Sequence, residues 1–152
     1  MTDHIVTHST FTLERTYPHA PARVYAAFAD KSQKAKWFAD PDAGPELTWD
    51  FDFREGGREY NSGPFMGQIH TFEAIYHDIL ENERIIYSYT MDVDGRKLSA
   101  SLATLEFEAV GDGTRLTLTE HGAFLDGNDD PAERERGTRE LLEMVGSSLD
   151  TP

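Results

Sequence analysis

The chain of 152 residues contains no cysteine, which excludes disulfide bonds and thiol chemistry. No stretch is long and apolar enough to span a bilayer, and the first ten residues, MTDHIVTHST, lack the basic start and apolar run of a signal peptide. No repeat, low-complexity segment or linker divides the sequence. We therefore expect a cytoplasmic protein with a single domain over residues 9–149, preceded by a flexible N-terminus, residues 1–8.

Basic residues are also scarce. The chain has 14 Lys and Arg against 28 Asp and Glu, which gives a formal net charge of −14. Such a chain is repelled by nucleic-acid phosphates and by anionic membrane surfaces, and no basic patch with interleaved aromatic residues is present. We therefore expect neither nucleic acid nor a membrane as a partner. The sequence does not decide between a monomer and a homodimer.

The common signatures of catalysis and of metal binding are absent. There is no Gly-x-Ser-x-Gly, no phosphate-binding loop and no His-Glu-x-x-His. His70 and His77 are seven residues apart in a predicted strand, so their side chains should lie on opposite faces. His4 and His8 have helical spacing, but nothing predicts a helix there. We expect no metal site and no cofactor, and the sequence leaves it uncertain whether the protein is an enzyme.

Two short helices are predicted near the N-terminus, after a strand at residues 9–17. Pro21 opens the first helix, which ends at Ala29. Asp30 caps the second, which runs to about Phe38.

From Leu47 onward, apolar and polar residues alternate in a way that predicts some six further strands. Short connections between successive strands indicate an antiparallel sheet. A loop is predicted at residues 122–129. The turns between strands are predicted at Glu55-Gly56-Gly57, Asn61-Ser62-Gly63-Pro64, Glu81-Asn82-Glu83, Asp94-Gly95 and Gly111-Asp112-Gly113.

A long C-terminal helix is predicted to follow, from Asp130 to Leu149. Asp130 can cap it, Pro131 occupies its first position, and Glu133 would complete a capping box. One helix covers one face of a sheet, so the fold class is α+β: a curved antiparallel sheet of about seven strands wrapped over a long helix. The apolar face of this helix comprises Leu141, Leu142, Val145 and Leu149.

The N-terminal half of this helix carries no large aliphatic residue on the same face, which continues with Thr138, Gly137 and Arg134. Gly137 in mid-helix costs about 1 kcal/mol relative to alanine. One interpretation is that this half lies over a space that it does not fill. The alternative is that Gly137 permits a close approach to a strand.

Three motifs carry a family resemblance. The first is Ala20–Phe28 followed by Trp37-Phe38, and the second is Phe51–Gly57, which contains Arg-x-Gly-Gly. The third comprises residues 83–87, then 113–118, then the terminal helix. Over residues 9–149 the chain resembles the START-like (SRPBCC) superfamily, with the helix-grip fold of the birch-pollen allergen. The second motif is similar to the branch of the C-terminal domain of the activator of the heat-shock-protein-ninety ATPase.

The resemblance implies a cavity between the sheet and the C-terminal helix, in which members bind hydrophobic small molecules. Some members act as polyketide cyclases or aromatases. The chaperone activators use this domain beside a second one, which this chain lacks. The primary hypothesis is binding of a hydrophobic or aromatic small molecule. The alternatives are a cyclase, dehydratase or hydrolase that acts on such a ligand, and a co-chaperone-like interaction module.

The candidate site residues are mostly aromatic side chains that share strand phases. Most such residues simply form core, whereas several together on a concave face suit a pocket for a ring-bearing ligand. Glu120 is the candidate acid/base group or polar anchor, because it shares a strand phase with Leu116 and Leu118, and Arg134 is its candidate partner. The alternative is that Glu120 lies at a solvated strand end. The predicted cavity residues are Phe28, Trp37, Phe38, Trp49, Phe51, Phe53, Tyr87, Tyr89, Met91, Phe107, Glu120, Arg134, Gly137, Thr138 and Leu141.

Overall fold

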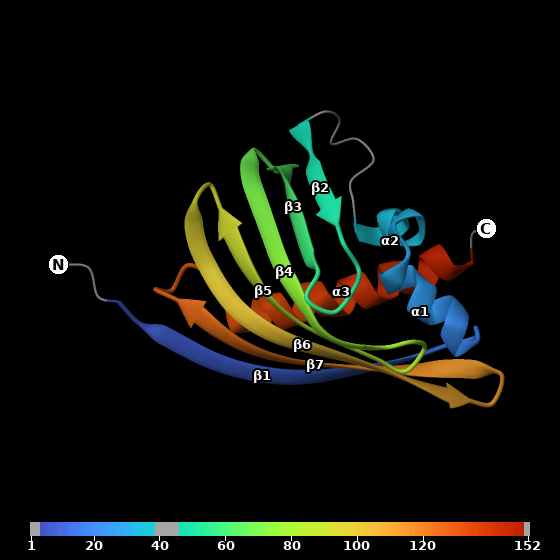
Figure 1. Cartoon of the computed structure of the whole chain (residues 1–152). Helices are drawn as coiled ribbons and strands as arrows, with labels where there is room; N and C mark the ends of the chain where they lie inside the picture. Colours follow the sequence, from blue (N-terminus) through green and yellow to red (C-terminus); the bar gives the residue numbers. More distant parts are fainter. Residues whose placement is uncertain (1–3, 39–45, 151–152) are drawn as a thin grey trace.

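A computed structural model describes residues 4–38 and 46–150. Seven strands form one antiparallel sheet in the order β1-β7-β6-β5-β4-β3-β2, and three helices accompany it (Figure 1). The predicted α+β helix-grip fold is confirmed. The elements are β1 (Val6–Tyr17), α1 (Pro21–Ala29), α2 (Lys31–Phe38), β2 (Thr48–Phe51), β3 (Arg58–Phe65), β4 (Gln68–Leu80), β5 (Arg84–Val93), β6 (Arg96–Val110), β7 (Gly113–Leu125) and α3 (Pro131–Leu149).

The sheet curves around α3, and α1 and α2 lie near the C-terminal half of that helix (Figure 1). The Tyr17 hydroxyl at the end of β1 donates a hydrogen bond of 2.8 Å to the carbonyl oxygen of Leu142. Arg23 of α1 donates to the carbonyl oxygen of Leu149, at 3.2 Å. These bonds tie α3 to the sheet and to α1 through its C-terminal half.

The two short helices begin as their sequences predict. Pro21 occupies the first turn of α1, where its missing N–H costs nothing. Asp30 caps α2, because its Oδ1 accepts hydrogen bonds from the backbone N–H groups of Ser32, at 2.9 Å, and Gln33, at 3.4 Å.

The start of α3 is only half as predicted. Asp130 caps the helix by accepting a hydrogen bond of 2.9 Å from the N–H of Ala132. The backbone N–H of Asp130, however, donates to Asp129 Oδ1, and Glu133 pairs with Arg136. The predicted capping box is therefore wrong, since the donor that Glu133 would satisfy already has an acceptor.

The turn predicted at residues 61–64 is also wrong, because β3 runs through it. The chain reverses instead at Met66 and Gly67, both at positive φ (52° and 80°). Strand β2 pairs with β3 only as far as Ser62, so Pro64 lies beyond the part of β3 that β2 covers. Proline is tolerated at such a position on a sheet edge.

Two strands are longer than predicted, and the additional residues of one strand pair with those of the other. Strand β1 begins at Val6 rather than Ser9, and β7 continues to Leu125, through part of the predicted 122–129 loop. The added residues pair directly, from Val6 with Leu125 to His8 with Ala123. Residues 1–3 of the N-terminal segment that was predicted to be flexible lie outside the described residues.

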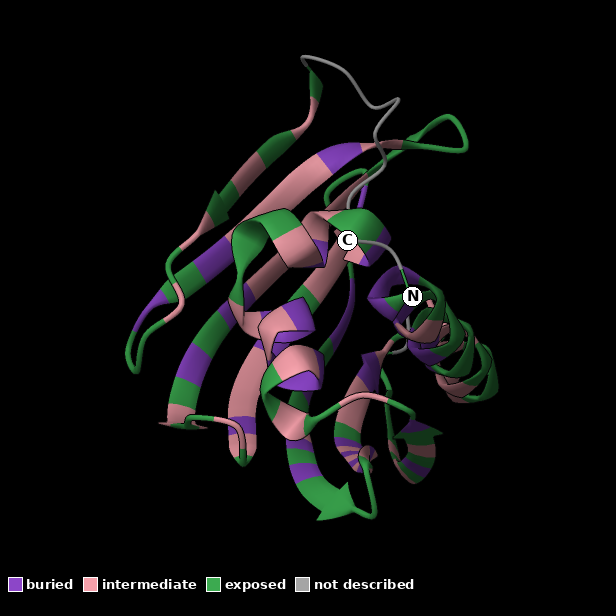
Figure 2. Ribbon diagram, turned by 90° about the vertical axis from the view of Figure 1, so that its right-hand side faces the viewer, coloured by how far each residue is buried: buried purple, intermediate pink, exposed green. Residues whose placement is uncertain are grey.

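The core lies where α1 and the C-terminal half of α3 meet the sheet. Val24 of α1 and Val145 of α3 are fully buried, as is Leu116 of β7. Buried and exposed positions alternate along the strands, as expected for a sheet with one covered face (Figure 2). The predicted apolar face of α3 is buried at Leu142, Val145 and Leu149, whereas Leu141 is 38% exposed.

Candidate functional site

A cavity of about 580 Å³ lies between the sheet and α3. Its walls come from α1, α2, the strands β3 to β7, and the segment from Asp129 to Val145. This volume falls within the range of small-molecule sites in proteins.

Gly137 explains why the space exists. It lines the cavity, and a Cβ atom added to it would meet no heavy atom within 4 Å. The interpretation that α3 lies over a space it does not fill is therefore confirmed, and the alternative of a close approach to a strand is wrong. The surroundings of Gly146, which lies further along α3, are different. A Cβ atom added there would lie 3.1 Å from Tyr17 Cε1.

Most of the predicted site residues surround this cavity, although their role in binding stays a prediction. Glu120 lies within β7 and is 4% exposed, so the alternative of a solvated strand end is wrong. The predicted residues that line the cavity are Phe28, Trp37, Phe38, Tyr87, Tyr89, Met91, Glu120, Arg134, Gly137, Thr138 and Leu141.

Three predicted residues from the second strand region, Trp49, Phe51 and Phe53, do not line it. Helix α2 covers the inner face of β2: Phe38 lies 5.7 Å from Trp49 between ring centroids, and the Lys34 ammonium lies 4.9 Å from the Phe51 ring. For Trp49 and Phe51 the strand phase was correct, but the helix occupies the space that a ligand would need. The Phe53 ring packs instead against Tyr76, with centroids 4.9 Å apart.

Phe107, the fourth such residue, is buried in the core. Its ring contacts Tyr25 and Phe28 of α1, with centroids 5.6 Å and 5.9 Å away. The core interpretation applies to this aromatic residue.

A first group of polar residues, the Glu120 cluster, connects β5, β6, β7 and the start of α3. The Tyr89 hydroxyl donates to Glu120 Oε2 at 2.8 Å and accepts from Arg134 Nη1 at 3.1 Å. Arg134 Nη2 donates to Ser99 Oγ at 2.8 Å and to Asp129 Oδ2 at 2.7 Å. Arg134, the predicted partner of Glu120, therefore reaches it through the Tyr89 hydroxyl.

Burial sets the protonation behaviour of this cluster. Burial raises the pKa of Glu120, against the hydrogen bond from Tyr89 and the charge of Arg134, which lower it. Burial also raises the pKa of Tyr89, and the neighbouring charge of Glu120 adds to that rise. Tyr89 is therefore a neutral donor, and Glu120 binds its proton more tightly than an ordinary glutamate.

A second group, the Lys34 cluster, lies on the α2 side and was not predicted. The Lys34 ammonium donates to Glu59 Oε1 at 2.7 Å, and the Tyr76 hydroxyl donates to the same oxygen at 2.6 Å. Trp49 Nε1 donates to Glu59 Oε2 at 2.9 Å. Burial lowers the pKa of Lys34, and the charge of Glu59 opposes that shift. The available sequence signal was a lysine three residues before the Trp37-Phe38 pair.

Tyr87 lies between the two clusters. Burial raises its pKa well above the ordinary value, and Tyr89, Glu120 and Glu59 add to the rise. Tyr87 lines the cavity, and its hydroxyl forms no hydrogen bond with any residue that the structure describes. It can therefore hydrogen-bond a molecule inside the cavity.

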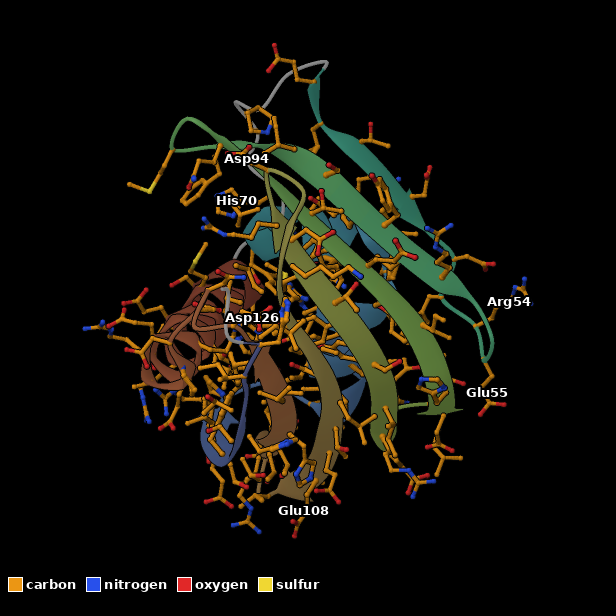
Figure 3. The ribbon with its side chains drawn as sticks, turned by 90° about the vertical axis from the view of Figure 1, so that its left-hand side faces the viewer. Arg54, Glu55, His70, Asp94, Glu108 and Asp126 are labelled. Atoms are coloured by element: carbon orange, nitrogen blue, oxygen red, sulfur yellow. The ribbon has the colours of Figure 1, made fainter. Side chains whose placement is uncertain are left out.

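His70 also lines the cavity, from the start of β4, whereas His77 is exposed and hydrogen-bonds Ser88. The predicted opposite orientation of the two histidines is confirmed. Figure 3 shows His70 and Asp94 at one end of the sheet, away from Arg54 and Glu55. In residues 4–38 and 46–150, no three His, Asp or Glu side chains are grouped closely enough to hold a metal ion.

The raised pKa of Glu120 makes a prediction about stability. The native state binds a proton at Glu120 more tightly than the unfolded state does, so its contribution to stability falls as pH rises from the unfolded to the folded pKa. In the Glu120→Gln variant this pH-dependent loss of stability is absent, because glutamine does not titrate. The free energy of unfolding of this variant minus that of the wild type, measured by urea denaturation, should increase as the pH rises above about 4.3, the ordinary pKa of glutamate.

The matched control for that measurement is Glu108→Gln, because Glu108 is exposed at the far end of β6 (Figure 3). Its stability difference from the wild type should change far less over the same pH range. A difference for Glu120→Gln that stays constant with pH would contradict the prediction.

The sequence matches the family model described as "Activator of Hsp90 ATPase homolog 1-like protein" over residues 18–151. The chain belongs to this family. The resemblance to the START-like superfamily is thereby confirmed. Among the described residues of this family member, no helix has the length and apolar character needed to cross a membrane.

Solved structures of similar fold include a protein from Rhizobium loti, 46% identical, with a TM-score of 0.89 over 95% of this chain and 99% of that one. Another, from Rhizobium leguminosarum, is 37% identical, with a TM-score of 0.93 over 99% and 100%. CalU16 from Micromonospora echinospora, 18% identical with a TM-score of 0.66 over 99% and 87%, shares the fold. No curated protein matches this family member significantly.

Proposed function

We propose that this protein binds a hydrophobic, ring-bearing small molecule in the cavity between the sheet and α3. The observation that carries the proposal is the cavity itself, which is about 580 Å³ in volume and has Gly137 opening its helical wall. A void of this size in a core would be costly if it served only the fold, since unfilled apolar space forfeits packing.

The lining supports a ring-bearing ligand. Phe72 lies 5.1 Å from Tyr89 between ring centroids, and Tyr87 lies 5.8 Å from Tyr89. Aromatic walls of this kind offer stacking and edge contacts to a ring. The unpartnered hydroxyl of Tyr87 and the carboxylate of Glu120 are two polar groups of lining residues that would orient it. Ligand binding is also common in the START-like fold.

Thermal-shift measurements against a library of aromatic and alicyclic compounds test the proposal. A cavity ligand at one hundred times its Kd adds about 2.7 kcal/mol to the free energy of unfolding. For a domain of this size, the Tm should rise by roughly 5–10 °C.

The control variant is Arg54→Ala, because Arg54 is exposed and lies at the opposite end of the sheet from His70 (Figure 3). A cavity ligand should shift the Tm of this variant as much as that of the wild type. Failure of every ring compound to shift the wild-type Tm would count against the proposal.

A further inference from the structure

The lysine, the arginine and most carboxylates that line the cavity each have a partner of opposite charge, and Glu133 pairs with Arg136. Lys34 is paired with Glu59 at 2.7 Å. Arg134 is paired with Asp129, also at 2.7 Å. Each buried cation thus has its own carboxylate, and neither is left to attract an anionic ligand.

Glu120 is the remaining carboxylate in the cavity wall, and it is not part of an ion pair with a described lysine or arginine. It forms no salt bridge with any lysine or arginine in the described ranges, and its only hydrogen bond there is from Tyr89 to Oε2. It is 4% exposed and lines the cavity. A buried carboxylate with one hydrogen bond is under-satisfied, so a group that donates to Oε1 would stabilise it.

The walls beside Glu120 suit a positive charge. The faces of Tyr and Phe rings attract cations, and Phe72, Tyr87 and Tyr89 line the same cavity. The protein holds its own ammonium in this way: Lys34 Nζ lies 4.4 Å from the Phe38 ring centroid and 4.9 Å from that of Phe51.

We infer that the cavity selects ring-bearing amines, whose protonated nitrogen pairs with the carboxylate of Glu120 while the ring packs against the aromatic walls. This inference rests on the proposed function, because it assigns the charge of the ligand bound at the same site. A ligand carboxylate is disfavoured there, because it would lie beside Glu120, and the lining lysine and arginine that the structure describes are already paired.

Three probes that share one ring system test the inference: 1-naphthylmethylamine, 1-naphthalenemethanol and 1-naphthoic acid, titrated at pH 7 by calorimetry. The amine should bind about ten-fold or more tightly than the alcohol, as expected for a charge-assisted hydrogen bond, and the acid should bind most weakly.

The variant Glu120→Gln removes the charge of the carboxylate but keeps a side chain of nearly the same shape. In this variant the amine should lose its advantage over the alcohol, because the side-chain amide that replaces the carboxylate carries no charge. Glu108→Gln removes the same charge from an exposed position and should leave the amine preference intact.

The outcomes are distinguishable. An acid that binds as tightly as the amine, or an amine preference that survives in Glu120→Gln, would overturn the inference, while binding of the alcohol would leave the proposed function standing. Failure of all three probes to bind would count against both.

Discussion

Replacing Glu59 by alanine should lower the free energy of unfolding by about 3–5 kcal/mol, because it leaves a buried ammonium without its counter-ion. Glu59 is fully buried and accepts hydrogen bonds from three side chains, those of Lys34, Tyr76 and Trp49. For a chain of this length the corresponding drop in Tm is roughly 10–15 °C. Urea denaturation and thermal unfolding measure both quantities.

The double variant Lys34→Met/Glu59→Gln is the control for that result. Removing both charges leaves no unpaired ion, so the double variant should be clearly more stable than Glu59→Ala. A loss of less than about 1 kcal/mol in Glu59→Ala would contradict the prediction.

Replacing Gly137 by leucine should abolish ligand binding while the protein stays folded. A Cβ at this position meets no heavy atom within 4 Å, so the new side chain enters the cavity instead of displacing a neighbour. Leucine is also the better helix former, by about 0.8 kcal/mol. We expect the Tm to be equal or higher, and the Kd for 1-naphthalenemethanol to rise by more than about ten-fold.

Gly146→Ala is the matched control, since both glycines lie within α3. There the added Cβ lies 3.1 Å from Tyr17 Cε1, so stability should gain less than from Gly137→Ala, or fall. Binding of the probe should be unchanged. If Gly137→Leu binds the probe as the wild type does, the ligand site lies elsewhere.

The sequence predicted the features that follow from the residue periodicity of one strand or one helix. Alternation placed Leu116, Leu118 and Glu120 on one face of β7, and all three are buried. The break in the apolar face of α3 at Gly137 likewise marked the cavity, because a helix that fills its groove has no reason to carry glycine there.

The features that the sequence could not predict depend on how two helices or strands pack against each other. Lys34 and Glu59 are 25 positions apart, on a helix and a strand, and each looks like an ordinary surface residue. Phe51 follows the correct strand phase, yet α2 occupies the space in front of it. Pro64 marks a turn in most sequences, but here it lies on an uncovered part of a strand, which only the sheet order reveals.

The pairing of β1 with β7 has a consequence for how the chain folds. Val6 pairs with Leu125 and Tyr17 with Thr114, so β1 stays without its neighbour until residues 114–125 have been synthesised. Strands β2 to β7 can form one hairpin after another, whereas β1 must close a loop of about one hundred residues. We therefore expect docking of β1 to be a late step on the ribosome and to slow refolding.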